Sequence, residues 1–188
     1  MADRPLNGHR VLMLVTNYGV EQDELLVPLK RLRQDGADVT VAAATADPVQ
    51  TLVGDKDPGE TVSPDATFDV VDPGDHQLLL LPGGTLNADQ LRLDDKALTI
   101  VKAFAGSGRP IAAICHGPWA LVEADVVRGR TLTSYASLRT DIRNAGAASW
   151  VDEPVVSDTS GDFTLVTSRT PKDLDAFLDA IDKALVGS

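Results

Sequence analysis

The sequence lacks most of the features that would assign it to a specialised class. It has a single cysteine among 188 residues, so no internal disulfide can form. No apolar run approaches the ~18 residues that a membrane-spanning helix needs. The amino-terminal residues carry no apolar signal segment. We therefore expect a cytoplasmic protein whose thiol stays reduced unless chemistry oxidises it.

Positive charge is also scarce. The chain has 17 Lys and Arg against 28 Asp and Glu, a formal net charge of −11, and its basic residues form no cluster. Phosphate backbones and anionic membranes would repel such a surface, so we expect neither a nucleic-acid nor a membrane partner. One Cys and three scattered His make no ligand-spaced set for a metal. The glycine spacing fits neither a phosphate loop nor a dinucleotide fingerprint, and we expect no cofactor.

What is present is a regular alternation of strand and helix patterns, which predicts one α/β domain over residues 1–188. Its sheet is mainly parallel, with helices on both faces. The turn-rich segment 48–71 is predicted to be a small hairpin at the sheet edge. Short apolar strands are predicted at 10–16, 39–44, 77–81, 110–114, 155–156 and 163–167, and helices at 21–34, 94–105, 116–124, 137–145 and from 170 onward.

Sites in open α/β sheets form beyond the carboxyl ends of the strands. Three predicted strand ends carry informative residues, at 17–21, at 82–84 and at Cys115-His116. The architecture brings them to one edge, although they are far apart in sequence. We therefore expect a single site there.

Cys115 stands where a strand runs straight into a helix, and such a corner exposes its residue much as the nucleophile elbow of hydrolases does. Ala113 and Gly117 are small enough to permit the sharp turn. The helix start is expected to favour the thiolate and lower the thiol pKa. The alternative is a buried structural cysteine, but the corner with His116 beside it favours a reactive one.

Each neighbour of the thiol has a functional and a structural interpretation. His116 acts as general base or acid if its ring reaches the sulfur, and is otherwise a surface histidine. A protonated Glu21 would donate a hydrogen bond to the sulfur, although its position alone favours an acid that complements a helix dipole. Backbone N–H groups of Gly83 and Gly84 would bind an oxyanion, or form only a turn. The remaining acids near helix starts are interpreted as solvated, namely Asp23, Glu24, Asp94 and Asp95.

Two motifs carry a family resemblance, Leu81-Pro82-Gly83-Gly84 and Ala113-Ile114-Cys115-His116-Gly117-Pro118. With them the chain resembles the ThiJ/PfpI family, the intracellular protease I branch of the class I glutamine amidotransferase-like superfamily. The resemblance implies a flavodoxin-like three-layer sandwich and self-association into a homo-oligomer. It implies that Cys115 is the nucleophile and Glu21 the carboxyl beneath it. It also implies that Asp89 of a neighbouring subunit orients His116.

Members of this family have been described as proteases, chaperones, glyoxalases, deglycases and oxidation sensors. The first hypothesis is a stress-protective enzyme acting on small reactive carbonyls or on carbonyl-modified proteins. Cys115 would add to the carbonyl carbon, His116 would move protons, and N–H groups of Gly84 and His116 would hold the oxygen. The alternatives are an oxidation-sensing stress protein without turnover, since no second cysteine resolves a sulfenic acid, and an intracellular cysteine peptidase.

Overall fold

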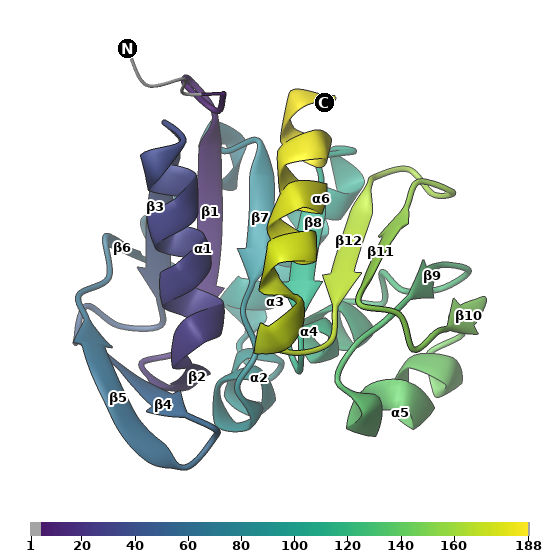
Figure 1. Ribbon diagram of the computed structural model, residues 1–188, viewed down its shortest axis with the longest axis horizontal. Coiled ribbons are helices and arrows are strands. Elements are labelled where there is room, and N and C mark those ends of the chain that lie inside the picture. Colours follow the sequence, from purple (N-terminus) through teal and green to yellow (C-terminus); the bar gives the residue numbers. More distant parts are fainter. Residues whose placement is uncertain (1–4, 188) are drawn as a thin grey trace.

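A computed structural model of the chain describes residues 5–187. A seven-stranded sheet lies at its centre (Figure 1), in the order β11-β12-β8-β7-β1-β3-β6. Every neighbouring pair is parallel except β11 with β12. The strands are β1 (Arg10–Val15), β3 (Asp38–Ala43), β6 (Ala66–Thr67), β7 (Leu78–Leu81), β8 (Ile111–Ile114), β11 (Val155–Asp158) and β12 (Leu165–Ser168).

Consecutive residues of each central strand enter opposite layers, because side chains alternate across a sheet. Val11 and Met13 join the core beneath α1 (Gln22–Gln34) and α6 (Leu174–Val186). Leu12 and Leu14 join the other core, with α3 (Asp95–Gly106), α4 (Pro118–Glu123) and α5 (Arg139–Asn144). Both faces are covered, and the strands are accordingly apolar throughout. The predicted three-layer α/β sandwich is confirmed.

The hairpin predicted within 48–71 is present as β4 (Val49–Val53) and β5 (Asp57–Val62). It does not extend the edge of the main sheet. It pairs with β2 (Tyr18–Glu21), a strand that the sequence did not predict, to make a separate three-stranded sheet. The main edge is instead closed by β6. Figure 1 shows the small sheet below the carboxyl end of β1. Its tip therefore lies where the site was expected.

Two more features were absent from the prediction. Helix α2 (Thr85–Leu91) begins directly after Gly84, and β9 (Thr131–Leu132) pairs in parallel with β10 (Ser149–Trp150). Within residues 5–187, no helix is both long and apolar enough to cross a membrane.

Candidate active site

Cys115 occupies the corner between β8 and α4. Its φ of +60° lies in the left-handed region, which costs a non-glycine residue roughly 1–2 kcal/mol. Its N–H donates to the Ser168 carbonyl at 3.0 Å, and its carbonyl accepts from the Tyr135 N–H at 2.9 Å. Gly117 makes the turn possible, because a Cβ there would lie 2.4 Å from the Leu81 carbonyl oxygen. The predicted corner is therefore present, with its strain, but the predicted exposure is wrong, because Cys115 is buried.

The ring of His116 reaches the sulfur directly. Nδ1 lies 3.1 Å from Cys115 Sγ, because the left-handed corner turns two adjacent side chains toward each other. On the far side of the ring, Nε2 lies 3.3 Å from the Ser137 hydroxyl. Tyr135 stacks on the ring with centroids 4.7 Å apart. His116 is therefore buried, not a surface residue, and its ring contacts Ser137 and Tyr135 of the same chain.

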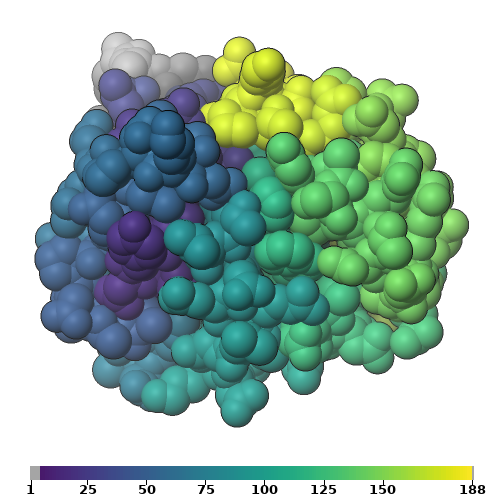
Figure 2. Space-filling model, turned by 90° about the horizontal axis from the view of Figure 1, so that it is seen from below, coloured from purple at the N-terminus to yellow at the C-terminus, as the bar shows by residue number. Residues whose placement is uncertain are grey.

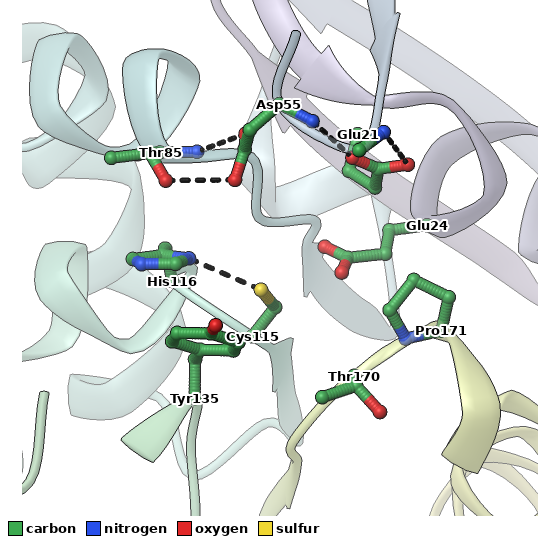
Figure 3. A pocket seen from close by; sticks show the side chains of 10 residues that line it. Glu21, Glu24, Asp55, Thr85, Cys115, His116, Tyr135, Thr170 and Pro171 are labelled. Atoms are coloured by element: carbon green, nitrogen blue, oxygen red, sulfur yellow. Dashed lines mark hydrogen bonds between the residues drawn. The ribbon is translucent and has the colours of Figure 1, made fainter. Parts of the chain in front are cut away.

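The carboxyl beneath the thiol belongs to Glu24, not Glu21 (Figure 3). Glu24 is fully buried on the inner face of α1. Its Oε2 accepts the Gly83 N–H at 2.7 Å. Its Oε1 has no N–H or O–H partner in the described part of the chain. The carboxyl group as a whole lies toward the thiol, with which it interacts. The solvated interpretation of Glu24 was wrong.

Glu21 lines the same site, but its carboxylate binds the tip of the β4–β5 hairpin. It is the residue before the first turn of α1, and its two oxygens accept the N–H groups of Gly54 at 3.1 Å and Asp55 at 3.0 Å. Asp55 in turn accepts Thr85 N–H at 2.7 Å and Thr85 Oγ1 at 2.8 Å. These four bonds fix the β4–β5 tip against α1 and α2.

Burial dominates the electrostatics of the thiol and its neighbours. Desolvation raises the pKa of Glu24 to about 8, so this carboxyl keeps its proton at neutral pH. Burial also raises the pKa of Cys115, with the Glu24 carboxylate as the next cause. The N–H groups of Gly84 and His116 oppose this rise. The predicted lowering is thus outweighed, because the helix start acts on a sulfur removed from water. Burial lowers the pKa of His116, which favours a neutral ring.

The two glycines that follow β7, Gly83 and Gly84, have different roles. The Gly84 N–H acts on the sulfur and opposes the rise in its pKa, whereas the Gly83 N–H is taken by Glu24. Gly83 is therefore not the oxyanion donor that the sequence predicted. Its lack of a side chain matters, since a Cβ would lie 2.8 Å from Cys115 Cβ. Buried Asn87 holds the turn by donating to the Gly83 carbonyl at 2.9 Å and accepting the Thr16 N–H at 2.7 Å.

These groups surround a pocket of about 310 Å³ at the carboxyl ends of the strands. Figure 2 looks onto this face, where segments far apart in the sequence meet. Figure 3 shows the thiol and the imidazole at the centre, with carboxylates along one side. The lining residues are Glu21, Glu24, Gly54, Asp55, Thr85, Cys115, His116, Tyr135, Thr170 and Pro171. No group of three or more His, Cys, Asp or Glu residues suited to a metal ion occurs among residues 5–187.

Asp89 lies elsewhere. It is exposed on α2 and is not among the residues that line the pocket. It forms no hydrogen bond or ion pair with His116 of the same chain.

Several site residues escaped the sequence analysis. Glu24 had a usable signal, because it stands four residues before Pro28 and eight before Leu32 on the buried stripe of α1. Asp55 and Thr85 gave no such signal, since the hairpin reaches them only through tertiary structure.

Known proteins resemble the whole chain. The sequence profile of the DJ-1/PfpI family matches residues 9–184. A deglycase of Thermococcus kodakarensis is 40% identical over 174 residues, covering 93% of this chain and 98% of the relative. The protein/nucleic acid deglycase 2 of Escherichia coli is 41% identical over 169 residues, covering 89% and 92%. Among solved structures, Drosophila melanogaster DJ-1beta superimposes with a TM-score of 0.82 at 27% identity, covering 96% of this chain and 91% of that one.

Proposed function

Because the chain belongs to the DJ-1/PfpI family, we propose that it is a cysteine-dependent enzyme of the glyoxalase or deglycase type. Its substrates are small reactive carbonyl compounds or carbonyl-modified proteins, and Cys115 is the nucleophile. Relatives at about 40% identity are named deglycases, which supports enzymatic activity in this family. The observation that carries the proposal is the 3.1 Å contact between Cys115 Sγ and His116 Nδ1 at the centre of an open pocket.

The protonation state follows from burial. Glu24, with a pKa raised to about 8, holds a proton at neutral pH and presents it to the sulfur. Burial raises the pKa of Cys115 as well, so the thiol is protonated at rest, and the thiolate forms when the thiol gives its proton to His116 Nδ1. The N–H groups of Gly84 and His116 then face the charge on the sulfur. A neutral His116 ring is free to accept a proton.

With methylglyoxal the steps balance without any oxidant. Cys115 Sγ bonds to the aldehyde carbon, and the carbonyl oxygen takes a proton to give a hemithioacetal. His116 then moves the proton on that carbon to the neighbouring carbon, while the hydroxyl proton passes to the neighbouring oxygen, so that the first carbon becomes a thioester carbonyl and the second carries the hydroxyl. Water cleaves the thioester, releasing lactate and restoring the thiol.

The test is lactate formation from methylglyoxal by the purified protein, without glutathione and with Cys115→Ala in parallel. We expect lactate from the unaltered chain and none from the variant. Retained turnover in Cys115→Ala would refute the scheme.

Oxidation sensing is the second candidate. The sequence favours it because no second cysteine is present to resolve an oxidised Cys115 as an internal disulfide. A relative in Bacillus subtilis, 39% identical, is named general stress protein 18. If no lactate forms and mild peroxide converts Cys115 to a sulfinate, the sensor replaces the enzyme. Peptidase activity, suggested by a relative named putative cysteine protease YraA, ranks third. It predicts Cys115-dependent cleavage of casein.

We also propose a cytoplasmic homo-oligomer in which Asp89 of a second copy approaches His116. Mixing Asp89→Asn with Cys115→Ala protomers tests this, because each supplies the group that the other lacks. Activity above that of either variant alone is expected; a purely additive result would remove Asp89 from the site.

A further inference from the structure

The pocket carries negative charge and no positive side chain. Among the ten described residues that line it there are three carboxyl groups and no Lys or Arg. Within residues 5–187, the carboxylates of Glu21 and Asp55 accept hydrogen bonds from backbone N–H groups and the Thr85 hydroxyl, and neither forms an ion pair with a Lys or Arg. An anionic substrate entering this pocket would meet like charge on the side where the hairpin lies.

Asp55 is the residue best placed to exert this effect. It stands at the hairpin tip in a left-handed conformation, φ +57°, and its carboxylate is held by two bonds to Thr85. Figure 3 shows this carboxylate beside His116 and above the thiol. Its charge acts electrostatically on both His116 and Glu24, the two groups flanking the sulfur. A fixed charge that acts on both neighbours also acts on a molecule bound between them.

The site is also built to receive a ligand. Glu24 is fully buried, lines the pocket beside the thiol, and has one carboxyl oxygen, Oε1, without a hydrogen-bond partner among the described residues. Glu21 and Asp55 line the same pocket, so a reagent that reaches Cys115 comes within the field of their charges.

We propose that Asp55 determines specificity by charge, so that the site accepts neutral or cationic carbonyl compounds and rejects anionic ones. The selection of carbonyl substrates rests on the proposed function. The charge discrimination at the thiol does not, and can be measured without turnover.

The primary experiment is alkylation of Cys115, the only cysteine in the chain. Second-order rate constants are measured with iodoacetamide, which is neutral, and with iodoacetate, which is anionic. The ratio of the two cancels the thiolate fraction, and dividing by the same ratio for 2-mercaptoethanol removes intrinsic reactivity. We expect the protein to disfavour iodoacetate about tenfold at low ionic strength, as one or two unit charges within several ångström would require. One molar salt should largely abolish this discrimination.

Three variants assign the effect. Asp55→Asn keeps an acceptor for the Thr85 N–H while removing the charge, and should recover about fivefold in the iodoacetate rate relative to iodoacetamide. Thr85→Val removes one of the two Thr85 bonds but keeps the charge, and should leave the ratio unchanged. Asp38→Asn removes an equal charge from the amino end of β3, at the opposite edge of the sheet, and should also leave it unchanged.

An unchanged ratio in Asp55→Asn would overturn the proposal, and so would an equal change in Thr85→Val, which would identify hairpin geometry as the cause. Turnover of phenylglyoxal against 4-carboxyphenylglyoxal extends the test to substrates, with the neutral compound preferred. If neither is turned over while the alkylation ratios behave as expected, the carbonyl function fails and the charge selection stands. If phenylglyoxal is turned over while the alkylation ratios of the protein and of 2-mercaptoethanol are equal, the carbonyl function stands and the charge selection fails.

Discussion

Two buried polar clusters in this protein differ in how completely their polar groups are paired. In the arginine cluster, made by Arg130 and Asp158, every charge has a partner. Arg130 Nε lies 3.0 Å from Asp158 Oδ1, and the second Asp158 oxygen accepts the Thr131 N–H. Burial by itself would raise the pKa of Asp158, but hydrogen bonds from Thr131, Ser160 and Arg130 lower it to about 2. The charged groups of the arginine cluster are therefore all paired, and we assign the cluster a structural role.

The thiol cluster, made by Cys115, His116 and Glu24, is left incomplete. Glu24 Oε1 has no N–H or O–H partner among the described residues, and no cation compensates the pair. Cys115 adopts a strained backbone conformation to face His116. Unpaired polar groups and strain cost stability, and they are retained where chemistry uses them. Variants of the thiol cluster should therefore reduce activity, and variants of the arginine cluster should reduce stability.

The largest expected effect is on turnover. His116→Ala should lower kcat/KM for methylglyoxal about 10²–10⁴-fold, the usual contribution of a general acid–base group. Alkylation of Cys115 by iodoacetamide, followed in the same variant, should persist because the sulfur remains. Turnover within threefold of the unaltered protein would remove His116 from proton transfer.

The arginine cluster should respond in stability. Arg130→Leu leaves Asp158 buried without its cation and should lower the free energy of unfolding by about 3–5 kcal/mol in urea titrations. The matched control is Arg128→Leu, whose side chain is 69% exposed and which should change stability by less than about 0.5 kcal/mol. Equal losses in both variants would contradict the distinction between the two clusters.

Glu24 should make stability depend on pH. Unfolded Glu24 loses its proton near pH 4.5, whereas the folded carboxyl keeps it to about pH 8. The folded state thus binds more protons in this window, and stability falls as pH rises. Between pH 5.5 and 7.5 this group should remove about 2–3 kcal/mol. Glu24→Gln should lose that slope while retaining an acceptor for Gly83, and exposed Glu153→Gln should keep it. A slope unchanged in Glu24→Gln would show that Glu24 is ionised when folded.

The smallest effect concerns the orientation of the imidazole. Ser137→Ala removes the hydroxyl 3.3 Å from His116 Nε2. Loss of one hydrogen bond, worth about 1 kcal/mol, should lower kcat two- to fivefold with KM unchanged. A loss as large as that of His116→Ala would make Ser137 part of the proton path, and no change would leave Tyr135 stacking as the orienting contact.

The central sheet was predictable because its strands are short apolar runs ending at turn residues, and the corner at Cys115 followed from a strand meeting a helix without a loop. The supporting carboxyl was not assigned correctly. The family resemblance pointed to Glu21, although its position alone favoured an acid that complements a helix dipole. In the structure the helix begins one residue later than predicted, and Glu24 faces inward. Glu24 was interpreted as solvated because it is charged, although its helical spacing indicated a buried position.

By itself, the sequence determined the α/β class, the location of the site at the carboxyl ends of the strands, and the residue at its centre. These depend on local patterns, namely apolar runs, helical spacing and a Gly-Pro turn after Cys115-His116. Only tertiary structure decided which carboxyl meets the thiol, that Gly84 and not Gly83 faces the sulfur, and that Asp55 borders the pocket. The reason is physical: hydrogen-bond partners and desolvation arise between segments 30 to 90 residues apart, which no local pattern records.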